Sequence, residues 1–157
     1  MKTSGFEVQD VENKFDYFWS VMDLCDWEQE GDDDAVLSPV IEYLSQQDDD
    51  MIFKFEDLMS ELLYNLDNES NYKLCEIRDE NTNDDTFLYS RCVALINGPE
   101  YYNNVLVGKE QSLWDMEFES MLYVAMEAWA LKYDADPLDF PHKSPLSYET
   151  RSNESGW

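Results

Sequence analysis

Basic residues are scarce in this chain, and their scarcity limits what its surface can bind. The 157 residues include 10 Lys and Arg, 36 Asp and Glu and one His, which gives a formal net charge of −26 at pH 7. A surface of this sign repels nucleic-acid phosphates and anionic membranes and attracts basic proteins. We therefore expect a basic protein as the partner, and no direct binding to nucleic acid or to a membrane.

Residue patterns of known catalytic, cofactor and metal sites are also missing. The single histidine, His142, and three distant cysteines give neither a zinc site with a histidine ligand nor a Cys–His pair. No glycine-rich phosphate loop occurs, and no acidic run matches the calcium loop of an EF-hand. We expect no metal, no cofactor and no enzymatic activity, although 36 acids leave a paired-carboxylate site of the glycosidase type open.

Long apolar runs are absent as well. No stretch of about 18 apolar residues exists that could form a transmembrane helix, and residues 1–10 lack the apolar centre of a secretory signal peptide. Cys25, Cys75 and Cys92 each fall at an apolar position of a helical pattern, as buried free thiols do in a reducing compartment. These observations predict a cytoplasmic protein.

Glycine and proline are rare, with five of each, which favours long helices over a fold with many turns. Hydrophobic residues make up 43% of the chain and aromatic residues 15%, so the acidity does not indicate a disordered chain. We predict an all-α fold, a single compact domain of about seven helices. The helical domain spans residues 13–133, after a flexible N-terminal lead (1–12) and before an irregular C-terminal tail (134–157).

Apolar residues spaced three and four positions apart predict where the helices lie. Pro39 fits the second helix only in its first turn, or as its first residue after an N-cap at Ser38. The run Asp48–Asp50 is interpreted as the N-cap of the third helix. The predicted helices cover residues 13–25, 36–44, 50–66, 72–79, 84–97, 99–108 and 114–133.

Acidic residues are unevenly distributed along the chain. Residues 1–50 hold fifteen acids and two bases, residues 51–100 eleven and four, and residues 101–157 ten and four. Two runs in the first part, with one tryptophan, form the predicted partner-binding surface, because carboxylates steer basic proteins and aromatic rings anchor interfaces. This predicted surface consists of Asp23, Asp26, Trp27, Glu28, Glu30, Asp32, Asp33, Asp34, Asp48, Asp49 and Asp50.

A compact polar group, Asp84, Asp85, Tyr89 and Arg91, stands apart from these runs. We interpret Asp85 as an acceptor at a helix N-terminus. Arg91 is interpreted as a partly buried, paired guanidinium that bridges to another helix. This structural role is favoured, and a ligand-binding or catalytic site built on the same residues is the alternative.

Three segments together carry a resemblance to a known family. They are Phe15-x-x-Phe18-Trp19, then Asp84-Asp85-x-Phe87-x-Tyr89-Ser90-Arg91 leading to Leu95-Ile96-x-Gly98, and Glu119-x-Met121-Leu122-Tyr123-x-Ala125. In order and separation they resemble the bacterial all-helical family called domain of unknown function 4240. The chain departs from the family pattern at Val93–Ala94, where the family commonly has a tryptophan, and in its plainer segment 72–79. The resemblance covers residues 15–133, implies a cytoplasmic helical bacterial domain, and implies no activity.

The leading functional hypothesis is a non-enzymatic bacterial immunity protein that inhibits a basic cognate toxin, such as a nuclease. Its carboxylates would replace substrate phosphates against the lysines and arginines of the toxin. The second hypothesis is a DNA mimic that occupies another nucleic-acid-binding protein, which regularly spaced carboxylates on an elongated face would favour over one compact patch. The third is an enzyme or small-molecule binder with a deep pocket lined by Asp84, Tyr89 and Arg91.

Overall fold

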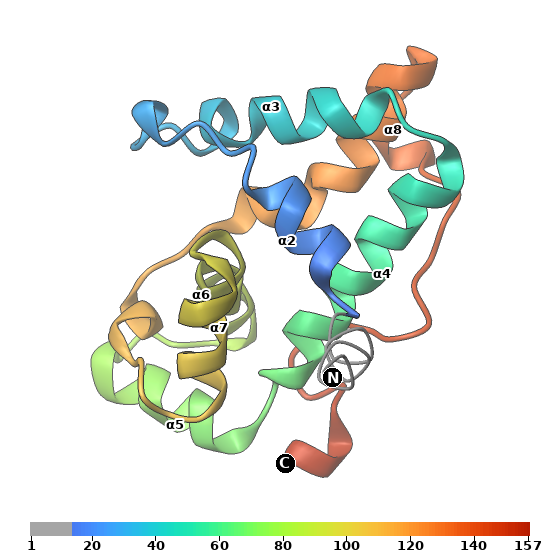
Figure 1. Cartoon of the computed structure of the whole chain (residues 1–157). Helices are drawn as coiled ribbons and strands as arrows, with labels where there is room; N and C mark the ends of the chain where they lie inside the picture. Colours follow the sequence, from blue (N-terminus) through green and yellow to red (C-terminus); the bar gives the residue numbers. More distant parts are fainter. Residues whose placement is uncertain (1–13) are drawn as a thin grey trace, which may run out of the picture.

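The computed structural model describes residues 14–157, and the predicted lead over residues 1–12 lies outside them. Within the described part the protein is all-α, as predicted, with seven α-helices and no β-strand (Figure 1). The helices are α2 (Asp16–Met22), α3 (Asp33–Ser45), α4 (Asp49–Asn65), α5 (Glu69–Arg78), α6 (Asp84–Ile96), α7 (Gly98–Leu106) and α8 (Val124–Tyr133). Short 3₁₀ turns are η1 (Trp27–Gln29), η2 (Ser112–Asp115), η3 (Glu119–Tyr123), η4 (Pro137–Asp139) and η5 (Glu154–Gly156).

The helices surround one apolar core. In Figure 1, α3 lies across the top with α8 packed against it, and α4 descends from the end of α3. Below them, α6 contacts α4, α7, η2 and η3. The core forms because each longer helix presents an apolar stripe to its neighbours. Its fully buried members include Phe18, Val40, Leu44, Ile52, Phe55, Met59, Leu63, Phe87, Cys92, Leu95, Met121 and Ala125.

The first helix is shorter than predicted. α2 ends at Met22, and Cys25 lies in the following turn, where its N–H donates to the Met22 carbonyl at 3.1 Å. The next N–H, that of Asp26, donates to the Val36 carbonyl of α3 at 3.0 Å. This bond to another helix turns the chain away from the α2 axis. Cys25 is half-buried because of this change of direction. Its position three residues after Met22 therefore does not mean that the helix continues to it.

Pro39 lies in the interior of α3, contrary to both positions considered for it. The helix begins at Asp33, and the carboxylate of the N-cap Asp32 accepts from the N–H of Ala35 at 3.1 Å. A proline inside a helix removes one backbone hydrogen bond and costs roughly 3 kcal/mol. The helix continues past it because one face is fully buried against the core, at Val36, Leu37, Val40 and Leu44.

The prediction of one helix over residues 114–133 is wrong. The chain forms η2, becomes extended at Met116, forms η3 and only then enters α8. The interruption is caused by hydrogen bonds to α6: the Phe118 N–H donates to the Tyr89 carbonyl at 3.1 Å. The Ser90 hydroxyl donates to the Met116 carbonyl at 2.5 Å. Backbone groups that a continuous helix would pair internally are thus paired with a neighbouring helix instead.

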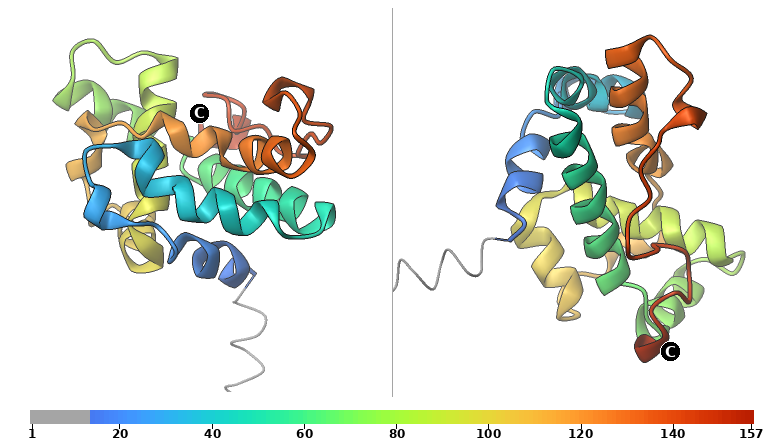
Figure 2. Two further views of the ribbon diagram at one scale, coloured as in Figure 1. Left: turned by 90° about the horizontal axis from the view of Figure 1, so that it is seen from above. Right: turned by 90° about the vertical axis from the view of Figure 1, so that its right-hand side faces the viewer.

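The C-terminal tail, residues 134–157, is irregular apart from the turns η4 and η5 and packs along the helices. Figure 2 shows it running beside α4. Near its middle, Asp57 of α4 receives hydrogen bonds from His142 Nε2 at 2.7 Å and from the Ser144 hydroxyl at 2.6 Å. Phe140 and Trp157 both pack against the core, so aromatic burial holds the tail at two places.

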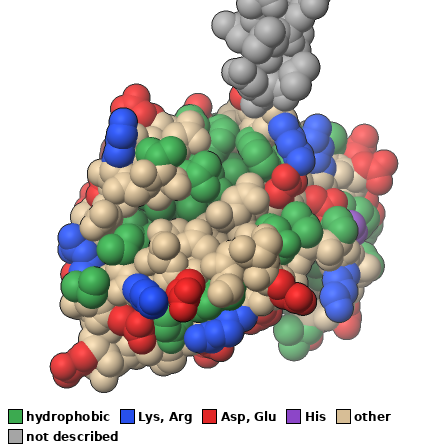
Figure 3. Space-filling view, turned by 90° about the horizontal axis from the view of Figure 1, so that it is seen from below, with side chains coloured by type: hydrophobic (Ala, Val, Ile, Leu, Met, Phe, Trp, Pro, Cys, Tyr) green, Lys and Arg blue, Asp and Glu red, His purple; other side chains and the backbone are tan. Residues whose placement is uncertain are grey.

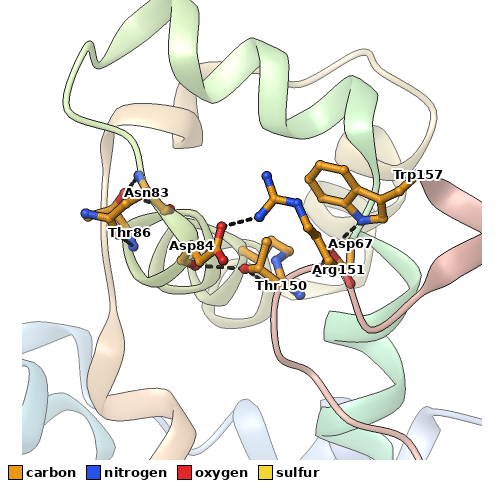
Figure 4. Close-up of polar contacts among 8 residues, drawn as sticks. Asp67, Asn83, Asp84, Thr86, Thr150, Arg151 and Trp157 are labelled. Atoms are coloured by element: carbon orange, nitrogen blue, oxygen red, sulfur yellow. Dashed lines mark hydrogen bonds and ion pairs between the residues drawn. The ribbon is translucent and has the colours of Figure 1, made fainter.

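Asp67, just after α4, holds the end of the tail. This carboxylate is 0% exposed and accepts three hydrogen bonds of 3.0 Å, from the N–H groups of Arg151 and Asn153 and from Trp157 Nε1. Figure 4 shows the bond from Trp157. Gly156 also approaches closely, since a Cβ at that position would lie 2.7 Å from the Asp67 carbonyl oxygen. The buried carboxylate is therefore paired entirely by residues that come more than eighty positions later, at a sequence separation of 84 to 90.

Replacing Asp67 by Asn tests this anchoring. An amide has one acceptor oxygen instead of two, so at least one buried N–H loses its acceptor, which costs about 2–3 kcal/mol. We expect Asp67→Asn to lower the free energy of unfolding in urea by that amount. The matched control Asp139→Asn changes an exposed carboxylate of the same tail and should remain within about 0.5 kcal/mol of the wild type. Equal effects of the two substitutions would contradict the anchoring role.

Candidate acidic binding groove

Trp27 lies in the middle of the first acidic run, on the turn η1. Carboxylates of the same run shape the backbone around it: Asp26 accepts from the N–H of Glu28 at 3.1 Å, and Asp32 caps α3. The Trp27 side chain remains 42% exposed and packs against the buried ring of Phe118, with centroids 6.5 Å apart. The Trp27 ring is therefore exposed to solvent, and the hydrogen bonds of Asp26 and Asp32 fix the backbone around it.

A groove of about 450 Å³ adjoins Trp27, between the start of α3 and the end of α6. Its floor is apolar because buried side chains of three segments meet there, and its edge carries carboxylates and an exposed thioether, that of Met116 (46% exposed). The floor includes Val36, Val93 and Phe118, and the carboxylates are those of Glu30, Asp33 and Glu117.

A second hollow, of about 260 Å³, shares Trp27 with this groove and is also lined by Trp19 and Asp23. Among the residues that line the two hollows, none is Lys, Arg or His. The lining offers apolar surface and acceptors of hydrogen bonds but no cation of its own. We call the two hollows the Trp27 site, defined by Asp23, Trp27, Glu30, Asp33 and Glu117. Its chemistry complements lysine and arginine side chains, which combine an apolar stem with a charged end.

The electrostatic surroundings of the Trp27 site are strongly negative. No Lys or Arg occurs between Lys14 and Lys54, a stretch that includes η1 and α3. Burial, and then the charges of Asp34 and Asp32, raise the pKa of Asp33 above its ordinary value. On the face opposite α3, by contrast, Lys and Arg side chains lie among the Asp and Glu (Figure 3). The carboxylates at the Trp27 site repel one another, and residues 15–53 supply no basic side chain to pair with them. A cation bound at the site would reduce this repulsion.

The second predicted acidic run lies at the other end of α3. A helix of 13 residues is about 20 Å long, so the structure does not bring Asp48–Asp50 together with Trp27. Asp48 occupies the N-cap position of α4 without a side-chain cap bond, and Asp49 accepts from Lys132 Nζ at 2.8 Å and from the Tyr133 hydroxyl at 2.7 Å. These bonds lower the pKa of Asp49. Asp50 is exposed, as are Glu28 and Asp34 in the first run.

The polar group around α6 is part of the scaffold. The N-cap is Asn83, not Asp85, and it forms a capping box with Thr86, whose N–H and hydroxyl both bond to it at 2.9 Å. Asp85 is exposed in the first turn. Tyr89 is half-buried, and its pKa is raised by burial and by Glu119.

Arg91 bridges α6 to α4, as predicted, but it is fully buried and hydrogen-bonds no carboxylate. Its guanidinium donates to the Leu63 carbonyl and to the Thr150 hydroxyl, both at 3.0 Å, and lies 4.7 Å from the centre of the Phe87 ring. Thr150 in turn donates to the Asp84 carbonyl at 2.7 Å (Figure 4). Burial lowers the pKa of Arg91 to about 10, partly offset by the charge of Asp67.

Asp84, Asp85, Tyr89 and Arg91 do not line a common pocket. A shallow hollow at the start of α6 includes the two aspartates but neither Tyr89 nor Arg91. The Asp84 carboxylate pairs with Arg151 of the tail. The deep pocket that the third hypothesis requires is therefore not formed by these four residues.

Sequence reasoning missed Met116, Glu117 and Phe118 at the Trp27 site. The predicted helix over 114–133 placed them within a regular element, and only the bonds to α6 expose them along the groove. The sequence did hold a local signal, because the six residues 114–119 include three acids and two aromatic residues, but the assignment to a regular helix masked it.

Comparisons with known proteins give one match. The family described as "Protein of unknown function (DUF4240)" matches residues 14–130. No curated protein and no solved structure matches the chain. Over residues 14–157, none of the helices has the length and apolar character needed to cross a membrane. In the same residues, no three His, Cys, Asp or Glu side chains are grouped so that they could hold a metal ion.

Arg91→Lys tests whether Arg91 is structural. A lysine has no planar fork to reach both the Leu63 carbonyl and the Thr150 hydroxyl, so at least one of these acceptors loses its donor. We expect the free energy of unfolding to fall by roughly 2–3 kcal/mol. Arg78→Lys, at an exposed arginine of α5, is the control and should change it by less than about 0.5 kcal/mol. An unchanged stability of Arg91→Lys in urea or thermal unfolding would refute the structural role.

Proposed function

The chain belongs to the DUF4240 family, whose function is unknown, and we propose its function from the chemistry of the Trp27 site. We propose that it is a non-enzymatic cytoplasmic binding protein. Its specific role would be that of a bacterial immunity protein, which inhibits a basic cognate toxin, such as a nuclease, by docking on it.

The observation that supports this proposal most directly is the exposed Trp27 between two hollows whose charged lining residues are all acids. Tryptophan is enriched among the residues that dominate binding energy at interfaces, especially where a surrounding rim excludes water. The apolar floor at Val36 and Phe118 provides burial for the stem of a basic side chain. Glu30, Asp33 and Glu117 provide the charges that pair with its end.

Inhibition would follow from competition for the cleft of the toxin. A nuclease cleft contains lysines and arginines that hold phosphates, and carboxylates can take the place of those phosphates. The net charge of −26 would accelerate encounter with a basic protein at low salt. Trp27 and Met116 would then slow dissociation through buried area.

The arrangement of the acids favours this role over the DNA mimic. Between the two acidic runs, α3 and the residues that follow it carry a single acid, Glu42, over residues 35–47. The acids are therefore gathered at the two ends of α3 and do not form a regular row like that of phosphates along a duplex. Asp49 is also paired with Lys132, which leaves the Trp27 site as the larger cluster of carboxylates without an ion pair among residues 14–157.

The proposal is tested by capture of the partner and by variants of the Trp27 site. The tagged protein is used to capture proteins from a lysate of its host at low salt and at about 0.5 M salt, where screening is short-ranged. A basic protein that is retained at low salt and released at high salt is then tested for toxicity, with and without co-expression of the tagged protein. A partner that is acidic, or whose activity the protein leaves unchanged, would contradict the immunity role.

For such a partner, Trp27→Ala should weaken binding about tenfold or more, as loss of a central aromatic does. The triple variant Glu30→Gln, Asp33→Asn, Glu117→Gln should slow association and reduce its dependence on salt. The control for Trp27→Ala is Tyr43→Ala, at another exposed aromatic ring. The control for the triple variant is Glu76→Gln, Glu80→Gln, Asp139→Asn, which has the same residue types and removes the same charge elsewhere. Equal losses in the controls and in the site variants, measured by surface binding kinetics, would assign the effect to net charge alone.

A further inference from the structure

A separate hollow of about 380 Å³ lies where the C-terminal tail passes over α4 and α8. Its walls come from three elements: Glu56 and Ser60 of α4, Met126 of α8, and Phe140 and Tyr148 of the tail. Figure 2 shows the tail running alongside α4 at this place. None of these residues lines the Trp27 site, so the hollow is independent of the function proposed above.

Glu56 is the unusual member of this lining. It is half-buried in the wall of the hollow, and within residues 14–157 its carboxylate forms neither a hydrogen bond nor an ion pair. The neighbouring Asp57, by contrast, is paired with both His142 and Ser144. Burial, and then the charge of Asp57, raise the pKa of Glu56 to about 7. A partly desolvated carboxylate without a protein partner offers a site for a cation from solution.

The other charged and titratable groups at the hollow do not compensate Glu56. From α4, Asp57 adds a second negative charge, and from the tail His142 is paired with Asp57. Lys143 lines the hollow but is exposed and forms no ion pair with Glu56. The Tyr148 hydroxyl stays protonated, because burial and then Glu56 raise its pKa to about 12. Among the described residues, no cationic group therefore pairs directly with the Glu56 carboxylate.

We propose that this hollow binds a small organic cation, an ammonium group with an apolar body, which pairs with the Glu56 carboxylate. The charged end of such a ligand satisfies Glu56, and its body packs against Phe140, Tyr148 and Met126. An inorganic cation fits less well, since no group of three metal-ligating side chains occurs in the described residues. The size of the hollow is at the lower end of the range of small-molecule sites.

The pH dependence of stability tests the first step, the burial of an ionisable Glu56. Because its pKa is raised on folding, Glu56 contributes stability that is present below its unfolded pKa of 4.5 and lost as the pH rises through about 7. Glu56→Gln removes this loss. We expect the variant to unfold at a higher temperature than the wild type at pH 8, and at nearly the same temperature at pH 4.5. A lower unfolding temperature at pH 8 would show that the carboxylate has a stabilising partner.

The proposal itself is tested by titrating benzylamine into the full chain at pH 8, with binding followed by amide chemical shifts. We expect shifts at Glu56, Met126 and Tyr148, and an affinity that Glu56→Gln lowers about tenfold or more, as loss of a charged hydrogen-bond partner does. Glu42→Gln removes an exposed carboxylate of α3 and should bind like the wild type. Benzyl alcohol, which has the same shape without the charge, should bind the wild type about tenfold more weakly. Affinity for benzylamine should also fall between pH 8 and pH 6, as Glu56 takes up a proton.

Three outcomes would overturn the proposal. The first is benzylamine causing no shifts at millimolar concentration, and the second is benzyl alcohol binding as tightly as benzylamine. The third is a tetralysine peptide causing the shifts around Glu56 when benzylamine does not, which would assign the hollow to side chains of a protein partner.

Discussion

Two buried groups of opposite charge, Asp67 and Arg91, are the constraint on which the fold depends. Neither side chain is exposed. Asp67 is paired by backbone N–H groups of the tail and by Trp157, whereas Arg91 divides its hydrogen bonds between the Leu63 carbonyl of α4 and Thr150 of the tail. Buried charges without partners cost several kcal/mol, so the helices and the tail stabilise one another or are lost together. The segment that begins at Asp84 contributes to this arrangement, because Asp84 contacts both Thr150 and Arg151.

The same arrangement explains how so acidic a chain folds around a continuous apolar core. Many acids lie at helix starts and in turns. There Asp26 and Asp32 accept hydrogen bonds from backbone N–H groups, and their negative charge interacts favourably with the positive end of the helix dipole. The few bases lie mainly after residue 50, where Lys132 and Arg151 pair with acids far away in the sequence. The uncompensated charge therefore collects around η1 and α3, next to Trp27.

The sequence predicted those elements whose causes are local. α4 follows from its regular apolar spacing, and α6 and α7 follow from their caps and glycine boundaries, so their predicted limits agree with the structure to within a few residues. The break between η2 and α8 was missed because it depends on hydrogen bonds to Tyr89 and Ser90 of α6. Asp67 and Glu56 were missed for a related reason: nothing near either distinguishes it from 35 other acids, and the partners of Asp67 lie beyond residue 150.

The anchoring of the tail also affects how the protein is made. The residues matched by the family end at 130, whereas Thr150, Arg151, Asn153 and Trp157 complete the contacts of Asp67 and Arg91. During synthesis, α4 and α6 leave the ribosome with these two charges unsatisfied and with the apolar surface under Phe140 and Trp157 uncovered. These contacts of the tail are therefore completed only after residue 157 has emerged, whereas the helical core can begin to pack before that point.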